Sequence, residues 1–201
     1  MRPAVFLDRD GTLVEEVSYL HEPDKVALVD GALPALRRLA DARFALVVVS
    51  NQAGVARGYY RERDVEAVHG RLQALLAAGG VALDGIWYCP HHPDGTVAGY
   101  ARACRCRKPG AGMLEAAAVA LRLDLAASWL VGNNPSDVGA ARAAGVAPLY
   151  VTTGRASGET PPPGVAAFPT LAAATAAILS QRVGGSAGER AAELRPGPPW
   201  P

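Results

Sequence analysis

The sequence lacks an excess of charge of either sign. Its 201 residues include 20 basic and 19 acidic side chains, which leaves a net charge near zero. Proteins that bind nucleic acid usually carry a basic patch or stripe, and the sequence shows none. It has no acidic tail either. We therefore expect no nucleic-acid partner.

Long apolar runs are also missing, although half of the residues are hydrophobic. A membrane-spanning helix needs about 20 consecutive apolar residues, and the longest runs here are much shorter. Met1 to Pro3 lead directly into a predicted strand, which leaves no room for a signal peptide. These absences predict a cytoplasmic enzyme with no membrane partner. We expect it to be a monomer with one domain large enough to bury a core.

Cysteine is scarce, and its odd number argues against a framework of disulfides. The three cysteines, Cys89, Cys104 and Cys106, lie in the single segment CPHHPDGTVAGYARACRC. With one imidazole, from His91 or His92, they form a Cys₃His set that suits a closed, structural zinc site. The alternative is three reduced cysteines beside two surface histidines.

Short apolar runs alternate with alanine-, leucine- and arginine-rich helical patterns. Strands are predicted at residues 4–8, 45–51, 85–90, 129–133 and 147–154. Helices are predicted at residues 31–42, 61–78, 110–123, 135–145 and 170–182. Because the strands show no polar alternation and helices follow them, they predict a parallel sheet covered on both faces. The fold class is therefore doubly wound α/β.

Proline, glycine and acidic residues mark the ends of these elements. Asp30 and the nearby Pro34 open the first helix, and Pro109 suits the entrance of the third. Residues 155–164 predict a loop. Composition changes again near the C-terminus, so we expect one domain over residues 1–182 and a disordered tail over residues 183–201.

Polar residues gather where the predicted strands end. Asp8 and Asp10 follow the first strand, residues 50–52 end the second, and Asn133 and Asn134 follow the fourth. The segment CRCRKP precedes a helix. Because parallel α/β sheets bind ligands at the carboxyl ends of their strands, this convergence predicts an active site.

Two aspartates stand close together in the segment VFLDRDGTLVEE. Carboxylates at this spacing repel each other and need a cation or a shared proton, although Asp-Gly is also a common turn. The segment DRDGT has the form DxDGT of the haloacid-dehalogenase-like phosphatases. The resemblance implies that Asp8 attacks phosphorus, that Asp10 is the acid and then the base, and that Mg²⁺ binds Asp8 and the carbonyl of Asp10.

The other motifs of that family also have counterparts. By resemblance, Ser50 donates to a phosphoryl oxygen together with Asn51, Gln52 and loop N–H groups, and Lys108 supplies a fixed cation. Arg107 would recognise another part of the substrate. The simpler alternatives are a Ser-Asn cap and a solvated lysine.

The segments FLDRDGTL, VVVSNQAGVARG, YCPHHPDG and CRCRKPGAGML resemble one subfamily in their order and content. It contains the D-glycero-D-manno-heptose 1,7-bisphosphate 7-phosphatases and the histidinol-phosphate phosphatases. The resemblance implies a zinc loop over residues 89–106 with His91 as the ligand, and a small phosphate ester as substrate. Because only about 36 residues separate Asp8 from the second predicted strand, there is no space for an inserted cap domain, and we expect a capless core. The heptose bisphosphate is favoured, with histidinol phosphate or another sugar phosphate as the alternative.

The same resemblance predicts substrate contacts in the loop from Glu16 to Tyr19 and at Arg57. Arg57 would bind a second phosphate or the sugar, although it could equally be a solvated loop residue.

One motif departs from the family. The fourth reads G-D-x-x-x-D in its relatives, with the first Asp as a magnesium ligand, whereas this chain has Asn133 there. Asn134 stands where the subfamily usually has a basic residue, and Asp137 is retained. We expect weakened magnesium binding, with Asp137 acting through a bound water. A phosphate-binding protein with little turnover is the alternative.

Overall fold

The computed structural model describes residues 1–154 and 161–184. These residues form a parallel sheet of six strands in the order β3-β2-β1-β4-β5-β6. The strands are β1 (Arg2–Leu7), β2 (Ala45–Asn51), β3 (Gly85–Cys89), β4 (Leu123–Gly132), β5 (Ala147–Val151) and β6 (Ala166–Phe168). The predicted doubly wound α/β class is confirmed.

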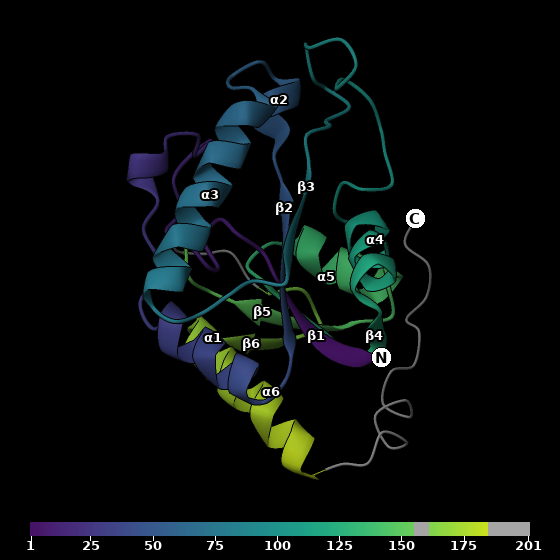
Figure 1. The fold of residues 1–201 in the computed structure, drawn as a ribbon. Helices are drawn as coiled ribbons and strands as arrows, with labels where there is room; N and C mark the ends of the chain where they lie inside the picture. The colour runs from purple at the N-terminus through teal and green to yellow at the C-terminus, as the bar shows by residue number, and fades with distance from the viewer. Residues whose placement is uncertain (155–160, 185–201) are drawn as a thin grey trace.

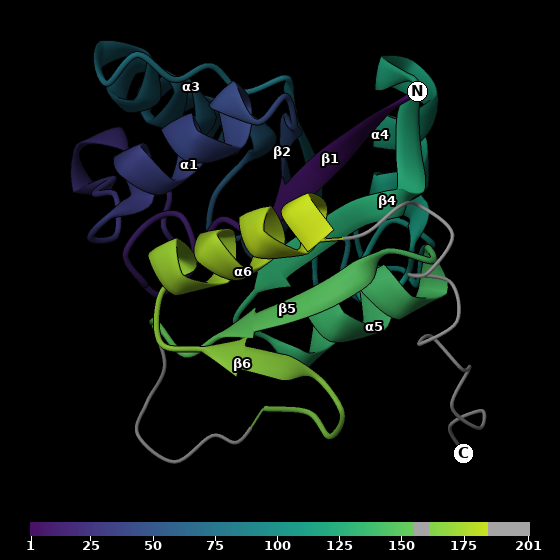
Figure 2. The same cartoon turned by 90° about the horizontal axis from the view of Figure 1, so that it is seen from below.

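Helices cover both faces of the sheet (Figures 1 and 2). One layer contains α1 (Ala32–Asp41), α3 (Glu62–Ala78) and α6 (Leu171–Gly184). The opposite layer contains α4 (Gly112–Leu121) and α5 (Pro135–Ala143). Two short elements, η1 (Pro23–Lys25) and α2 (Ala53–Ala56), lie in the connections.

Strand β1 shows why the sequence lacks polar alternation. Val5 and Leu7 pack into the core beneath α1, α3 and α6, whereas Ala4 and Phe6 pack beneath α4 and α5. All four side chains are fully buried. A central strand of a parallel sheet is apolar on both faces. Asp8 therefore directly follows a strand that is buried in the core.

The topology places a ligand crevice between β1 and β4. The chain runs outward from β1 through β2 to β3, and then returns to β4 and continues outward to β6. Such a reversal of strand order leaves a crevice at the carboxyl ends of the two neighbouring strands. Asp8 follows β1 and Asn133 follows β4, so the two motifs meet at this crevice.

The predicted end of the third helix was wrong. Helix α4 ends at Leu121, because Arg122 adopts a left-handed conformation (φ 54°) that a helix cannot continue through. The chain then enters β4 at Leu123, well before the predicted start at residue 129. The early part of β4 pairs with Arg2 and Pro3, which also lengthens β1.

Three smaller expectations also change. Gly31, in a left-handed conformation, precedes α1, so Asp30 does not cap that helix. Helix α4 begins at Gly112, so Pro109 is not its first residue. The short strand β6 was not predicted, because three residues of sequence AAF carry no usable period.

The C-terminal helix lies where it was predicted and continues to Gly184. The predicted tail beyond residue 184, and residues 155–160 of the predicted loop, lie outside the described residues. In the part of the chain that is described, no helix is both long and apolar enough to cross a bilayer.

Candidate active site

The predicted polar residues line one cavity of about 430 Å³ at the carboxyl edge of the sheet. Those that face it are Asp8, Asp10, Glu16, Tyr19, Ser50, Asn51, Gln52, Arg107, Lys108, Asn133 and Asn134. Asp137 does not line the cavity but forms an ion pair with Lys108, which does. Arg57 does not line the cavity. The residues that the strand-end argument selected therefore come together at one cavity.

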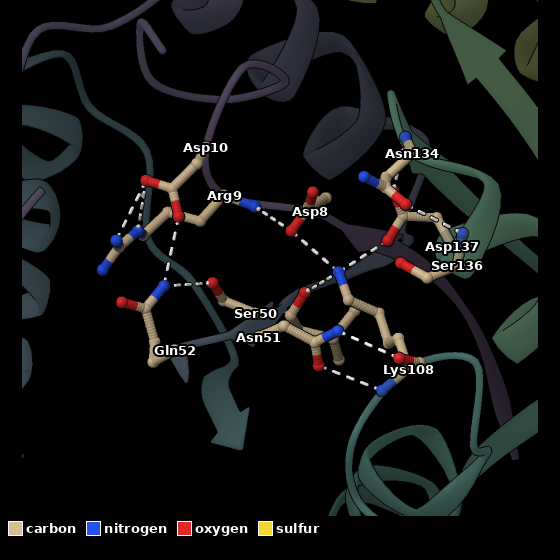
Figure 3. Close-up of polar contacts among 11 residues, drawn as sticks. Asp8, Arg9, Asp10, Ser50, Asn51, Gln52, Lys108, Asn134, Ser136 and Asp137 are labelled. Carbon is tan, nitrogen blue, oxygen red and sulfur yellow. Dashed lines mark hydrogen bonds and ion pairs between the residues drawn. The ribbon is translucent and has the colours of Figure 1, made fainter. Parts of the chain in front are cut away.

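Lys108 is the centre of the site (Figure 3). Its side chain is 2% exposed, and its Nζ lies 2.8 Å from Oδ1 of Asp8, 2.6 Å from Oδ1 of Asp137 and 2.8 Å from the carbonyl oxygen of Val49. The ammonium therefore donates two hydrogen bonds, to Asp8 and Val49, and forms a close ion pair with Asp137. Burial alone would lower the pKa of Lys108, but Asp137 and Asp8 raise it, so the amine stays charged.

Asn51 fixes the backbone of this lysine. Its Nδ2 donates to the carbonyl oxygen of Lys108, and its Oδ1 accepts from the N–H of Lys108, both at 3.0 Å. Asn51 therefore holds Lys108 in place, and the second hydrogen on its Nδ2 remains for a ligand. The hydroxyl of Ser50 accepts from Nε2 of Gln52 at 2.7 Å, which leaves its own proton for a phosphoryl oxygen.

A capping box places Asp137. Asn134 is the N-cap of α5 and accepts from the N–H of Ser136, while Oδ2 of Asp137 accepts from the N–H of Asn134 at 2.9 Å. Pro135 occupies the first helical position, so the sequence NPSD is typical of a helix start. Burial, and then repulsion from Asp8, raise the pKa of Asp137 to about 6, although the positive charge of Lys108 acts to lower it.

This placement bears on the predicted metal role of Asp137. Both of its oxygens are engaged, one by Lys108 and one by the N–H of Asn134. The structure thus gives Asp137 a defined task in holding Lys108, and its contact with magnesium through a water remains a prediction.

Asp10 lies on the other side of the cavity beside a buried arginine. Arg9, which is 1% exposed, places its Nε 3.0 Å and its Nη2 2.9 Å from Oδ1 of Asp10. Gln52 donates from Nε2 to Oδ2 of Asp10 at 3.1 Å. Burial raises the pKa of the Asp10 carboxyl, and the charge of Arg9 opposes that rise.

Asn133 closes the crevice between β1 and β4. It is buried, and its Nδ2 donates to the carbonyl oxygen of Thr153 at 3.0 Å. A Cβ on Gly11 would lie 2.1 Å from that Nδ2, so only glycine at residue 11 leaves space for the amide.

The donor set of the cavity fits magnesium, which prefers oxygen ligands. Both hydrogen bonds to Asp8 are accepted by Oδ1, so its Oδ2 can face a cation. The amide oxygen of Asn133 and the carbonyl of Asp10 would complete the set implied by the family.

The predicted substrate contacts are only partly gathered at the cavity. Glu16 and Tyr19 lie on its rim, and Tyr19 packs edge-on against Tyr59. Arg107 also lines it and donates to the carbonyl of His91 at 3.3 Å. Arg57 instead reaches His92, with 3.5 Å between its Nη2 and Nε2 of the imidazole.

The predicted zinc ligands form a second, separate cluster. The ligand atoms of Cys89, His91, Cys104 and Cys106 all lie within 4.8 Å of one another. The sulfur atoms are 3.2 to 3.5 Å apart, too far for a disulfide. Nδ1 of His91 lies 3.3 Å from Sγ of Cys106. A Cys₃His set of this kind can hold a structural zinc ion.

The cluster also separates the two histidines. Nδ1 of His91 faces the thiols, and Arg102 contacts its Nε2 at 2.9 Å. His92 points elsewhere, where its Nδ1 accepts from the N–H of Asp94 at 3.1 Å. The structure thus places His91, and not His92, with the cysteines.

Sequence reasoning missed three buried residues next to the predicted ones. Arg9, Tyr60 and His69 are each less than 10% exposed and lie in the hydrogen-bonded surroundings of Asp10. A charged residue between two motif aspartates was a signal for Arg9. Nothing in the helical pattern distinguished His69 from an ordinary core residue.

A buried lysine thus holds a carboxylate at the end of β1, in a cavity whose oxygen ligands suit a divalent cation. A family model described as HAD-hydrolase-like matches residues 105–174. D-glycero-beta-D-manno-heptose-1,7-bisphosphate 7-phosphatase of Yersinia pestis is 46% identical over 154 residues, which cover 76% of this chain and 82% of that protein. The D-glycero-D-manno-heptose-1,7-bisphosphate 7-phosphatase of Thermosynechococcus vestitus is 48% identical over 157 residues, which cover 76% of this chain and 80% of that protein.

A solved structure is similar as well. D,D-heptose 1,7-bisphosphate phosphatase from B. bronchiseptica, complexed with magnesium and phosphate, is 35% identical with a TM-score of 0.76, over 90% of this chain and 99% of that one. The chain belongs to the haloacid-dehalogenase-like phosphatases, in the subfamily of the heptose-1,7-bisphosphate 7-phosphatases. It is a phosphatase.

The cysteine cluster predicts about one zinc ion per chain in protein purified without chelator. His91→Asn should release it and lower the thermal midpoint by about 5–15 °C, since 1 kcal/mol corresponds to about 2–4 °C at this size. His92→Asn is the matched control and should keep both zinc and stability. Elemental analysis and a thermal melt provide the readouts, and wild-type protein without zinc would contradict the assignment.

Asn133→Asp should strengthen magnesium binding. The added charge faces a divalent cation, and about 1.4–4 kcal/mol corresponds to roughly a 10–1000-fold change in affinity. Without magnesium the new carboxylate would meet the carbonyl oxygen of Thr153, which now accepts from the amide of Asn133. The variant should therefore show a larger rise in thermal midpoint on adding magnesium, and half-saturation of activity at lower magnesium.

Asn134→Asp is the control for this comparison, because it adds the same charge one residue away and preserves the helix cap. Equal magnesium curves for Asn133→Asp and the wild type, or an equal shift in Asn134→Asp, would show that residue 133 is not a ligand.

Proposed function

We propose that this phosphatase removes the 7-phosphate of D-glycero-D-manno-heptose 1,7-bisphosphate. The relatives that carry this name match over most of the chain. A cavity of about 430 Å³ with polar walls suits a small phosphorylated sugar. The observation that carries the proposed reaction is the contact between Lys108 and Asp8, because a nucleophilic carboxylate must be held rigidly in place.

In the proposed reaction, Asp8 attacks phosphorus and forms an aspartyl-phosphate. Asp10 gives its proton to the leaving oxygen and then takes a proton from the water that hydrolyses the intermediate. Lys108 holds Asp8 in place and offers positive charge to the phosphoryl group, and the free hydroxyl proton of Ser50 binds one phosphoryl oxygen. Asp137 holds the ammonium of Lys108 through an ion pair, and Asn51 holds the backbone of Lys108 through hydrogen bonds.

Magnesium held by Asp8, the carbonyl of Asp10 and Asn133 would supply positive charge that offsets the charge on the phosphoryl group. The neutral amide of Asn133 favours a second candidate function, a phosphate-binding homologue with low turnover. The two differ in the rate expected at saturating magnesium.

Substrate recognition is assigned to residues on the rim of the cavity. Glu16 and Tyr19 would contact the sugar, and Arg107 would bind its second phosphate or a hydroxyl group. Arg57 can join them only if it moves from its contact with His92. We further propose that the enzyme acts as a monomer in the cytoplasm.

The substrate proposal is tested with steady-state kinetics on a panel of phosphate esters at saturating magnesium. We expect kcat/KM for the heptose 1,7-bisphosphate to exceed that for histidinol phosphate and for simple hexose phosphates by at least about tenfold. Preference for histidinol phosphate would overturn the assignment, and no turnover of any ester would favour the phosphate-binding alternative.

Asp8→Asn should abolish turnover and leave the fold intact. The amide keeps the oxygen that accepts from Lys108 but cannot act as a nucleophile, so kcat should fall more than about a thousandfold. A thermal melt close to that of the wild type is the control for folding. Substantial remaining activity would exclude the aspartyl-phosphate.

A further inference from the structure

A buried network of hydrogen bonds surrounds the carboxyl group of Asp10 on the side away from Lys108 (Figure 3). Oδ1 lies against the guanidinium of Arg9, and Oδ2 accepts from the amide Nε2 of Gln52. Both partners are donors that cannot accept a proton. A proton on Asp10 therefore has no acceptor in this network, and only a group inside the cavity can receive it.

His69 fixes the far end of Arg9. Nη1 of Arg9 lies 3.3 Å from Nε2 of His69, a residue of α3. Burial, and then the charge of Arg9, lower the pKa of His69 to about 3, so the ring is neutral and Nε2 can accept. Tyr88 packs edge-on against the imidazole, with ring centroids 5.4 Å apart, and limits its rotation. The guanidinium is thus held at both ends.

Tyr60 determines which end of the Gln52 amide faces Asp10. Its hydroxyl donates to Oε1 of Gln52 at 2.9 Å, which turns Nε2 toward Asp10 and Ser50. Burial is the main cause that raises the pKa of Tyr60 to about 12, so the phenol remains a donor. Without that donor the amide could rotate by half a turn and place an oxygen against the carboxylate.

The ring of Tyr60 is itself held tightly. The imidazole of His21 stacks on it, with centroids 5.4 Å apart and 14° between the planes. A Cβ on Gly54 would lie 2.2 Å from the Tyr60 ring, so a glycine is required for the ring to occupy this place. These two contacts hold the ring with its hydroxyl directed at Gln52.

We propose that Tyr60 and His69 are positioning residues for the acid step. Tyr60 acts through Gln52 and His69 acts through Arg9, and together they direct the proton of Asp10 to the leaving oxygen in the cavity. The inference rests on the proposed function, because it takes Asp10 as the acid.

The test compares two leaving groups. The leaving group of an alkyl phosphate is a strongly basic alkoxide, which needs a proton from the general acid. The leaving group of p-nitrophenyl phosphate is a stable phenolate, which does not need one. The alkyl substrate is the ester that the wild-type protein hydrolyses best. Since kcat/KM covers only the steps up to formation of the aspartyl-phosphate, it isolates the acid step for both substrates.

Tyr60→Phe should lower kcat/KM for the alkyl phosphate by about 10–100-fold, part of the 10²–10⁴-fold that a general acid contributes. Its kcat/KM for p-nitrophenyl phosphate should stay within about threefold of the wild type. Tyr59→Phe, the same change at the exposed neighbour, should alter neither value. His69→Leu should show the same selective loss, and His69→Gln, which restores an acceptor, should recover most of it.

Asp10→Asn is the reference for interpreting these results. Suppose that Asp10→Asn lowers kcat/KM for the alkyl phosphate only, whereas Tyr60→Phe lowers kcat/KM for both substrates equally or for neither. The inference is then wrong, and the proposed function stands. If Asp10→Asn itself lowers both values equally, Asp10 is not the acid, and the proposed mechanism fails together with the inference.

Discussion

The buried ammonium of Lys108 is the interaction on which the rest of the site depends. It joins the end of β1 through Asp8, the start of α5 through Asp137 and the end of β2 through Val49. Breaking a buried ion pair of this kind commonly costs about 3–5 kcal/mol, because a charge is left without a partner. One side chain thus fixes Asp8, the proposed nucleophile, and the crevice around it.

The charge around this lysine explains why a divalent cation belongs in the cavity. Asp8 and Asp137 bring two negative charges, and Lys108 and Arg9 bring two positive ones. Asp10 holds its proton for the leaving oxygen in the proposed reaction, so the charge of the phosphate is left for a metal ion to offset. The family pattern, with Asp at residue 133, would add a negative charge to this site. Because Asn133 is neutral, we predict a weaker attraction for magnesium than that pattern provides.

Much of the fold and the site was predictable, because strand ends and motif spacing constrain the backbone directly. The parallel sheet, the cavity residues and the gathering of Cys89, His91, Cys104 and Cys106 all follow from local sequence. The contacts of Asn51 with Lys108, and that of Arg9 with His69, join segments far apart in the chain and depend on tertiary packing. The end of α4 was missed because arginine seldom adopts the left-handed conformation of Arg122.

The most direct measurement for the account is the detection of the phosphorylated residue itself. Protein mixed with substrate and quenched in acid within one turnover is reduced with borohydride, which converts an aspartyl-phosphate to homoserine, and the peptides are then sequenced by mass spectrometry. The account predicts homoserine at residue 8 and not at residue 10 or residue 137. Turnover without any modified carboxylate, or modification at another aspartate, would contradict it.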